Sequence, residues 1–303
     1  GAINYIVAKP TDTFSAGADA SVGNFSTFDV AGYVSGPLSE NVKARLAVRT
    51  LQSGPWQYSY TRNDSLGKKN LFQGRFLVDI QASEKLKLSF NLNGWRDRGD
   101  TQAAQLQSDN CAGSTAGTCG SPDAFNFRDY PRAPQNARAA DWGYGIFGRP
   151  LKRNDSFWQA SMRADYELDD NLTLTSISAY SKYKTDSVQD FDGSRFASAD
   201  TNTTGYINNF AQELRVSGTY DKLNFILGAN YTRANTYDRL FYNFSEGPSS
   251  NPLYMIPGAP RGVLTYNDSD QDTRDIGVFF NAEYELAPGL TLIVSKNGSG
   301  PTT

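Results

Sequence analysis

The stretch LKLSFNLNGW, residues 86–95, alternates apolar and polar side chains over most of its length. Successive side chains of a β-strand point to opposite faces, so a period of two predicts a strand with one apolar and one polar face. A helix would need apolar residues three and four positions apart. The predicted apolar face holds Leu86, Leu88, Phe90 and Leu92, and the polar face holds Lys87, Ser89, Asn91 and Asn93.

The same alternation recurs along the chain, in residues 42–49, 158–166, 225–232 and 276–285. The composition agrees with strands, because Tyr (17) and Phe (18) are abundant while Met (2) is nearly absent. No window approaches the roughly 18 to 20 consecutive apolar residues that a membrane-spanning helix needs. The sequence therefore predicts an all-β chain.

The connections between the predicted strands are of two kinds that alternate along the chain. Tight polar turns are expected at residues 37–42, 81–85, 168–171, 219–222 and 286–289. Long irregular segments are expected at residues 54–69, 98–155, 185–204 and 237–272, with the Gly23-Asn24 hairpin tip as the single short member of this set. Because antiparallel strands place every second connection at the same end, one end of the sheet should carry the tight turns and the other the long loops.

A soluble β-sandwich would also alternate apolar and polar residues, so the period alone does not place the chain in a membrane. Outer-membrane barrels add short periplasmic turns, long extracellular loops and aromatic girdles. Tyr166 and Tyr284 each lie two residues before a tight turn, where a girdle would be, although strand ends also carry ordinary tyrosines. Unstructured connections as long as 98–155 are rare in compact soluble domains. We therefore predict an antiparallel meander of about eleven strands that forms a partial transmembrane β-barrel.

Six segments also resemble, in order, the TonB-dependent outer-membrane receptors of the iron-complex or siderophore type. They are GAINYIVAKPTDTFSAGADASVGNF (1–25), LQSGPWQYSYTRNDSLGKKN (51–70), NLNGWRDRGDTQ (91–102), LTLTSISAYSKYKTDSVQDFDGS (172–194), QELRVSG (212–218) and QDTRDIGVFFNAEYELAPGLTL (271–292). Each motif is weak by itself, but together they extend over nearly the whole chain.

The resemblance implies a receptor in the bacterial outer membrane, surrounded by lipid, that captures ferric siderophores or similar metal chelates. Such a receptor is energised through TonB, performs no catalytic step, and has no resident cofactor, since the ferric chelate is its transported ligand. It further implies that residues 1–10 are the C-terminal end of a plug domain and residues 11–296 the N-terminal part of the barrel, with 297–303 as an atypical tail. We expect the TonB contact to lie in a missing N-terminal region and the chain to be an incomplete fragment.

The segment 98–155 is the best candidate for ligand recognition, because it interleaves aromatic rings with arginines. Stacking surfaces beside fixed positive charge suit an anionic, planar metal chelate. The alternative is that the rings pack the loop against itself and its neighbours. The candidate ligand-binding residues are Arg128, Tyr130, Arg132, Trp142, Tyr144 and Arg149. Charged residues expected to face the lumen should instead satisfy one another or the plug; they are Arg45, Arg49, Arg75, Asp79, Glu213 and Arg215.

Several other chemistries find no support in the sequence. The chain has no histidine, which removes His-based catalytic triads and most imidazole metal sites. Asp268, Asp270 and Asp272 mimic the first ligands of a calcium loop. However, Thr273 replaces the required glycine and Phe279 the bidentate Glu, so a solvated acidic loop is expected rather than a metal site. The near balance of 29 Lys and Arg against 32 Asp and Glu gives no sign of a nucleic-acid partner.

Two classes of function remain open at this point. The first is the transport receptor. The second is a non-transporting β-rich surface or adhesin-like protein whose loops bind a macromolecule or glycan. Hydrolase activity ranks third, since no convincing catalytic constellation is present.

The two cysteines generate a prediction. Cys111 and Cys119 are separated by the flexible segment AGSTAGT, and outside a reducing cytosol this spacing permits a small loop disulfide. Thiol labelling of the protein in its native membrane should be weak before reduction and strong after it. Equal labelling in the two states would count against the bond.

Overall fold

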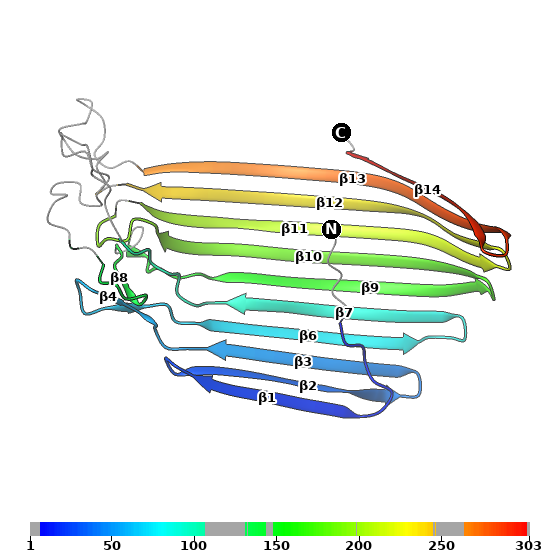
Figure 1. Cartoon of the computed structure of the whole chain (residues 1–303), viewed down its shortest axis with the longest axis horizontal. Coiled ribbons are helices and arrows are strands. Elements are labelled where there is room, and N and C mark those ends of the chain that lie inside the picture. The colour runs from blue at the N-terminus through cyan, green and yellow to red at the C-terminus, as the bar shows by residue number, and fades with distance from the viewer. Residues whose placement is uncertain are drawn as a thin grey trace.

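The chain forms one broad, curved sheet in the computed structural model (Figure 1). The structure describes residues 7–106, 131, 133–143, 148–197, 199–244, 246 and 264–301. All the regular elements in these ranges are strands, which confirms the all-β prediction. None of the described residues belongs to a helix long and apolar enough to cross a membrane.

The main sheet has eleven strands in chain order, so the predicted meander is confirmed. Each strand pairs antiparallel with the next, while the two outermost strands have one neighbour each and leave the described sheet open. The strands are β1 (Ser15–Gly23), β2 (Thr27–Ser39), β3 (Val42–Gln52), β6 (Asn70–Gln81), β7 (Leu86–Asp97), β9 (Asp155–Asp169), β10 (Leu172–Asp190), β11 (Asp200–Tyr220), β12 (Leu223–Asn243), β13 (Leu264–Ala287) and β14 (Leu290–Pro301).

Three short strands form a second sheet at the end of the long connections (Figure 1). They are β4 (Gln57–Ser59), β5 (Ser65–Leu66) and β8 (Ala139–Ala140), of which β4 and β8 run parallel. The sequence did not indicate them, because two- and three-residue strands show no measurable period. They bring two connections that are far apart in the sequence into one structure.

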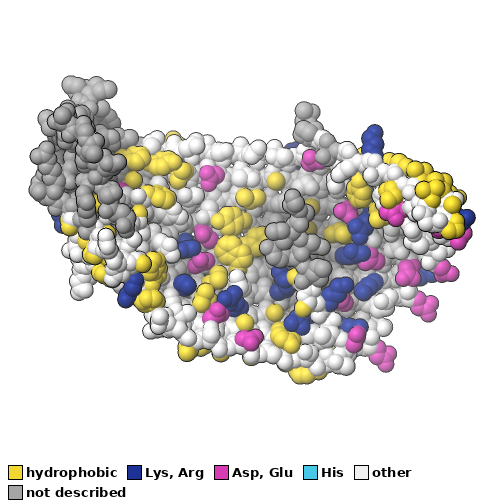
Figure 2. All heavy atoms as spheres, viewed as in Figure 1, with side chains coloured by type: hydrophobic (Ala, Val, Ile, Leu, Met, Phe, Trp, Pro, Cys, Tyr) yellow, Lys and Arg dark blue, Asp and Glu magenta, His cyan; other side chains and the backbone are white. Residues whose placement is uncertain are grey.

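The register across the main sheet places the alternating apolar residues on one face, called the apolar face below. Leu46 pairs with Val34 and Phe76, and Phe76 pairs with Leu92. These side chains are largely uncovered, with 44% of Leu46 and 51% of Leu92 exposed. No protein layer among the described residues covers this face. The opposite, polar face carries the basic and acidic side chains that gather over the middle strands in Figure 2.

Two of the expected long loops are wrong, because strands occupy much of them. β10 continues to Asp190 and β11 begins at Asp200, so most of residues 185–204 is strand. Likewise β12 extends to Asn243 and β13 begins at Leu264, within the expected loop 237–272. In residues 185–190, 200–204 and 267–272 nearly every side chain is polar, and Leu240, Phe241 and Tyr242 follow one another directly. The apolar–polar alternation that reveals a strand is therefore absent, while the backbone ladder continues. At the C-terminus, β14 runs past residue 296 to Pro301.

The first hairpin tip lies just after the predicted Gly23-Asn24 position, at residues 24–26 between β1 and β2. Phe25 (φ 61°) and Ser26 (φ 52°) both adopt left-handed conformations, which gives the type I′ geometry that matches the twist of hairpin strands. The carbonyl oxygen of Phe25 accepts a hydrogen bond from the Gly54 N–H at 2.7 Å. This bond ties the tip to the connection that carries β4.

The paired glycines Gly74 and Gly94 generate a test of this packing. A Cβ on Gly94 would lie 2.6 Å from the carbonyl oxygen of Phe157, whereas one on Gly74 would find only the Phe72 ring, at 3.9 Å. Gly94→Ala should therefore lower the free energy of unfolding by about 1–3 kcal/mol, because backbone must shift. Gly74→Ala is the matched control and should be neutral or slightly stabilising. Equal denaturation curves for the two variants would contradict the register between β7 and β9.

Candidate functional site

The long connections form a packed layer at one end of the sheet, called the loop layer below and comprising residues 56–66, 100–106, 138–143 and 148–151. Its centre is the one cluster of buried apolar side chains found among the described residues. The main sheet exposes its apolar residues, so the loop layer has the more conventional protein core. The cluster consists of Leu66, Ala103, Ala140, Trp142 and Leu151.

Buried polar side chains join separate segments of the loop layer. The Gln57 side chain donates to the Ala103 carbonyl oxygen at 2.9 Å and accepts from the Ala103 N–H at 3.0 Å. Both partners are buried, so the amide satisfies a backbone donor and acceptor that would otherwise be unpaired. This reciprocal pair links β4 to residues 101–106.

Asp141 is the polar centre of the layer, and none of its surface is exposed. It accepts hydrogen bonds from the Ser59 hydroxyl at 2.9 Å, from the Trp142 N–H at 3.1 Å and from the Thr61 hydroxyl. The Arg62 guanidinium lies 3.6 Å from the carboxylate. The buried charge is therefore hydrogen-bonded and paired, as a carboxylate removed from water must be.

A hollow of about 350 Å³ opens at the loop layer. Trp142 lines it with residues of both charges. Arg62 places its guanidinium carbon 5.6 Å from the centre of the Trp142 ring, within cation–π range. The charged lining residues are Arg62, Asp64, Lys68, Asp100 and Lys152. The two lysines can attract a small anionic ligand, while Asp64 and Asp100 in the same lining would repel part of its charge.

The structure places two of the six candidate ligand-binding residues, and it does not bring them together. Trp142 is 4% exposed and belongs to the core of the loop layer. Arg149 does not line the hollow; its guanidinium pairs with Asp186 at 2.8 Å and donates to the Asn202 side chain at 3.0 Å. The other four, Arg128, Tyr130, Arg132 and Tyr144, lie outside the described residues, as do Cys111 and Cys119.

A second hollow, of about 450 Å³, lies on the polar face of the main sheet. Arg45, Arg49 and Arg75 line it together with Tyr33 and Trp95. Arg49 makes two hydrogen bonds to Asp29, at 2.9 and 2.7 Å, and Arg45 stacks 3.9 Å from the centre of the Tyr33 ring. The buried Nε of Arg75 has no hydrogen-bond partner in the described chain.

The other charges expected on this face have local partners. Arg215 pairs with Glu213 at 3.3 Å, and Asp79 accepts a hydrogen bond from the Ser89 hydroxyl at 2.6 Å. Arg215 and Glu213 thus pair with each other as expected, whereas the partners of Asp79 and Arg49 lie outside the expected set.

The acidic run at residues 268–272 lies on strand β13, so the expected solvated loop is wrong in its backbone. Asp268 pairs with Arg239 and Asp272 with Arg233 on the neighbouring strand. The hydrogen bond from Arg239 lowers the pKa of the Asp268 carboxyl below its usual value. Alternating sequence positions place these carboxylates along one face of a strand rather than around an ion.

Sequence reasoning missed a different acidic group, formed by Asp190, Asp192 and Asp200. Asp190 ends β10 and Asp200 begins β11, and the two form the last residue pair of that hairpin. The signal was two aspartates at the end of one strand and a third at the start of the next. The sequence does not predict that these aspartates meet, because it indicates a loop over residues 185–204 and not two paired strand ends.

The fold is similar to that of solved siderophore receptors. The pyoverdine outer membrane receptor FpvA from Pseudomonas aeruginosa PAO1 matches with a TM-score of 0.68 at 11% identity, over 96% of this chain and 41% of that chain. The siderophore receptor PiuA from Acinetobacter baumannii gives 0.65 at 12% identity, over 97% and 47%. The alcaligin receptor FauA from Bordetella pertussis gives 0.53 at 12% identity, over 96% and 37%.

The chain thus has the fold of part of a siderophore-receptor β-barrel, and it spans less than half the length of these three receptors. No protein-family model matches the sequence. No curated protein matches it either. At such low identities the likeness establishes the fold.

The burial of Asp141 generates a prediction for the loop layer. Asp141→Ala leaves Arg62 without its buried carboxylate, and breaking a buried ion pair costs about 3–5 kcal/mol. We expect faster hydrogen exchange of the β4 amides while the amides of β7 keep their protection. Asp186→Ala, which removes the exposed partner of Arg149, is the control and should leave β4 unchanged. Unaltered exchange in Asp141→Ala would show that Asp141 does not hold the layer together.

Proposed function

We propose that this chain is part of a TonB-energised receptor of the bacterial outer membrane that takes up ferric siderophores or similar metal chelates. The observation that carries the proposal is the uncovered apolar face of a sheet whose fold is that of siderophore receptors. Water is a poor solvent for such a face, whereas lipid is a good one.

The height of the apolar face supports a membrane location. On β12 the residues facing this side are apolar or aromatic from Leu223 to Tyr231, a span of nine residues, and the next is Arg233. Neighbouring β13 repeats the band, since Tyr231 pairs with Ile276 and Leu223 with Tyr284. A tilted strand needs about 9–11 residues to cross the hydrocarbon layer. The halves of β12 and β13 toward the long-loop end then lie in water, where their ion pairs Arg239–Asp268 and Arg233–Asp272 are solvated.

Aromatic side chains mark both borders of this band. Trp158 and Tyr180 lie 5.3 Å apart between ring centres toward the long-loop end. Tyr166, Tyr220 and Tyr284 lie near the tight turns, and each is at least 39% exposed. Rings at these heights are typical of the interfacial girdles of membrane barrels, where an amphipathic ring contacts both lipid and water.

Ligand capture is assigned to the long-loop end, which faces outward in this orientation. The hollow of the loop layer offers Lys68 and Lys152, whose ammonium groups form no ion pair among the described residues, beside Arg62 and Trp142. Anionic chelates would be drawn by these charges, whereas the buried Trp142 contributes mainly to the wall of the hollow. Arg149, which is paired with Asp186, is expected to contribute less. No covalent step is needed for capture or release.

Transport can be tested in a deletion strain of the host bacterium. Under iron limitation it should lose growth on one or a few defined ferric chelates, and the intact gene should restore growth only when TonB is present. Normal growth of the deletion strain on every chelate, together with binding of cells or glycans by the purified protein, would favour the adhesin-like alternative. Detergent dependence and heat-modifiable migration would separately report the barrel.

The hollow yields a prediction on affinity. Lys68→Ala and Lys152→Ala should each weaken binding of the recognised ferric chelate by about threefold, and together by about tenfold, because exposed charges contribute modestly. Lys184→Ala, which removes an exposed lysine from outside this hollow, is the control. Binding is measured by fluorescence quenching of the intact receptor in detergent. Unchanged affinity in the double variant would remove the hollow from the binding site.

A further inference from the structure

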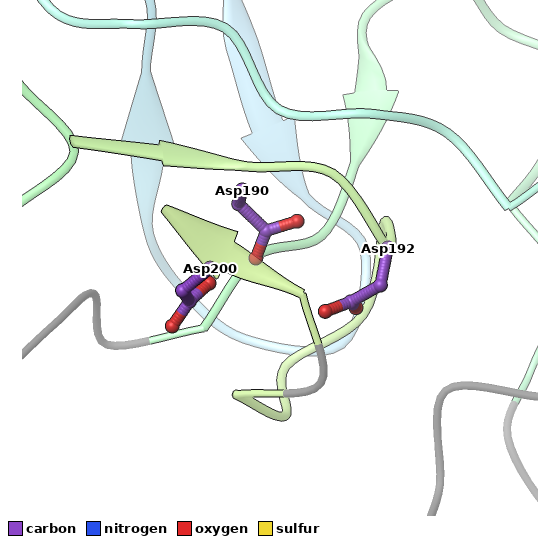
Figure 3. Close-up of side chains that lie close together, drawn as sticks. All are labelled: Asp190, Asp192 and Asp200. Carbon is purple, nitrogen blue, oxygen red and sulfur yellow. The ribbon is translucent and has the colours of Figure 1, made fainter. Parts of the chain in front are cut away.

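The carboxyl groups of Asp190, Asp192 and Asp200 turn toward one another where the β10–β11 hairpin meets the loop layer (Figure 3). One oxygen from each lies within 4.8 Å of the others. Oxygens bound to the same calcium ion at 2.3–2.6 Å can be at most about 5 Å apart. The three carboxylates are therefore close enough to share one ion.

Asp200 provides a second, independent observation. None of its surface is exposed, and its two buried carboxylate oxygens have no hydrogen-bond donor among the described residues apart from a protonated Asp190 carboxyl. A charged carboxylate removed from water without a partner is strongly unfavourable, and Asp200 would be in this position without a proton or an ion. Figure 3 shows it facing Asp190, which is also an acid.

The neighbouring carboxylates make a charged Asp200 still less favourable. Asp190 and Asp200 are directly opposite each other across the hairpin, and like charges in that position destabilise a sheet. Burial raises the pKa of both carboxyls, and the negative charge of Asp192 raises each further. Asp190 and Asp200 therefore require positive charge between them. A shared proton or a bound cation could supply it.

Backbone amides already orient two of the three carboxylates. Asp190 accepts from the N–H groups of Gly143 at 2.7 Å and Gly193 at 3.1 Å. Asp192 accepts from those of Ser194 at 2.8 Å and Ala199 at 2.9 Å. A carboxylate has about four acceptor positions, so with these two bonds Asp190 keeps lone pairs for an ion. The side chains are thus held in place before a ligand arrives.

Gly143 brings the loop layer up to this group. A Cβ at this position would lie 3.1 Å from Oδ2 of Asp200 and 3.1 Å from the carbonyl oxygen of Phe196. Only a residue without a side chain leaves both oxygens uncrowded. The group therefore joins the end of β10, the start of β11 and the loop layer at one point.

We propose that Asp190, Asp192 and Asp200 form a binding site for a divalent cation of the calcium type, which fastens the loop layer to the main sheet. Hard oxygen ligands in an irregular loop suit Ca²⁺, which accepts variable geometry, better than Mg²⁺, which demands an octahedron. The proposal is independent of the transport function, because cation binding is measured without any chelate.

The test uses the full chain in detergent after treatment with a chelator. Tb³⁺ should bind and emit on excitation of tryptophan, since Trp142 adjoins Gly143, and Ca²⁺ should displace it. Ca²⁺ at about millimolar concentration should also raise the thermal midpoint, because a ligand that binds only the folded state stabilises it.

Asp200→Asn is the decisive variant. It should weaken Ca²⁺ binding by about 100-fold or more. Its midpoint without Ca²⁺ should be no lower than that of the wild type, because the substitution removes a buried like-charge contact, and this also shows that the variant folds. The control is Asp270→Asn, in the acidic run on β13, which should respond to Ca²⁺ like the wild type.

Two results would overturn the proposal. If the wild type shows no Ca²⁺-dependent change in midpoint or Tb³⁺ emission, a shared proton holds the carboxyls together. If Asp200→Asn responds to Ca²⁺ as the wild type does, any ion binds elsewhere.

Discussion

An apolar face with no protein cover is the constraint on which the rest of the described structure depends. The main sheet is a single layer, and side chains such as Leu92 and Val278 are half exposed or more. A soluble sheet buries such a face against a helix layer or a second sheet. In lipid the same face needs no cover, provided that each strand finds its backbone partners in its neighbours. The eleven-stranded antiparallel ladder supplies these partners for every strand except along the two edges.

The sheet and the loop layer are therefore stabilised by different interactions. In the sheet, backbone pairing is continuous and apolar side chains face outward. In the loop layer, strands are short and irregular, so buried side chains such as Gln57 and Asp141 must satisfy the polar groups that a ladder would otherwise pair. Within the described part of the chain, a conventional apolar core forms only here, around Trp142. This gives a firm platform at the end of the molecule where ligand capture is proposed.

Charge is distributed according to the same division. Along the polar face, Arg49 pairs with Asp29 and Arg215 with Glu213, so the pairs lie within the sheet. Above the apolar band, Arg239 and Asp268 pair across β12 and β13 on the side that is apolar lower down. Exposed pairs of this kind contribute little to stability, but in the proposed membrane orientation they mark where the strands would leave the hydrocarbon. The acidic group at the β10–β11 hairpin is the exception, because its charges have the same sign.

The sequence by itself determined the sheet, because side-chain alternation is a local property. Residues 86–95 show a period of two, and the register of β7 with β6 and β9 confirmed it. Turn residues likewise predicted the end of the sheet that carries the tight turns, and the ordered motifs predicted the receptor fold. Where nearly every side chain is polar, as in residues 185–190 and 267–272, the period disappears and the strands were missed.

Only the tertiary structure decided which distant side chains meet. Trp142 and Arg149 are close in sequence, yet one enters a core while the other turns to Asp186, because backbone direction in an irregular connection is set by contacts and not by spacing. Asp190 and Asp200 are ten positions apart but become cross-strand partners, and Gly143 reaches them from another connection. A site of this kind depends on register and long-range packing, which residue order along one chain does not encode locally.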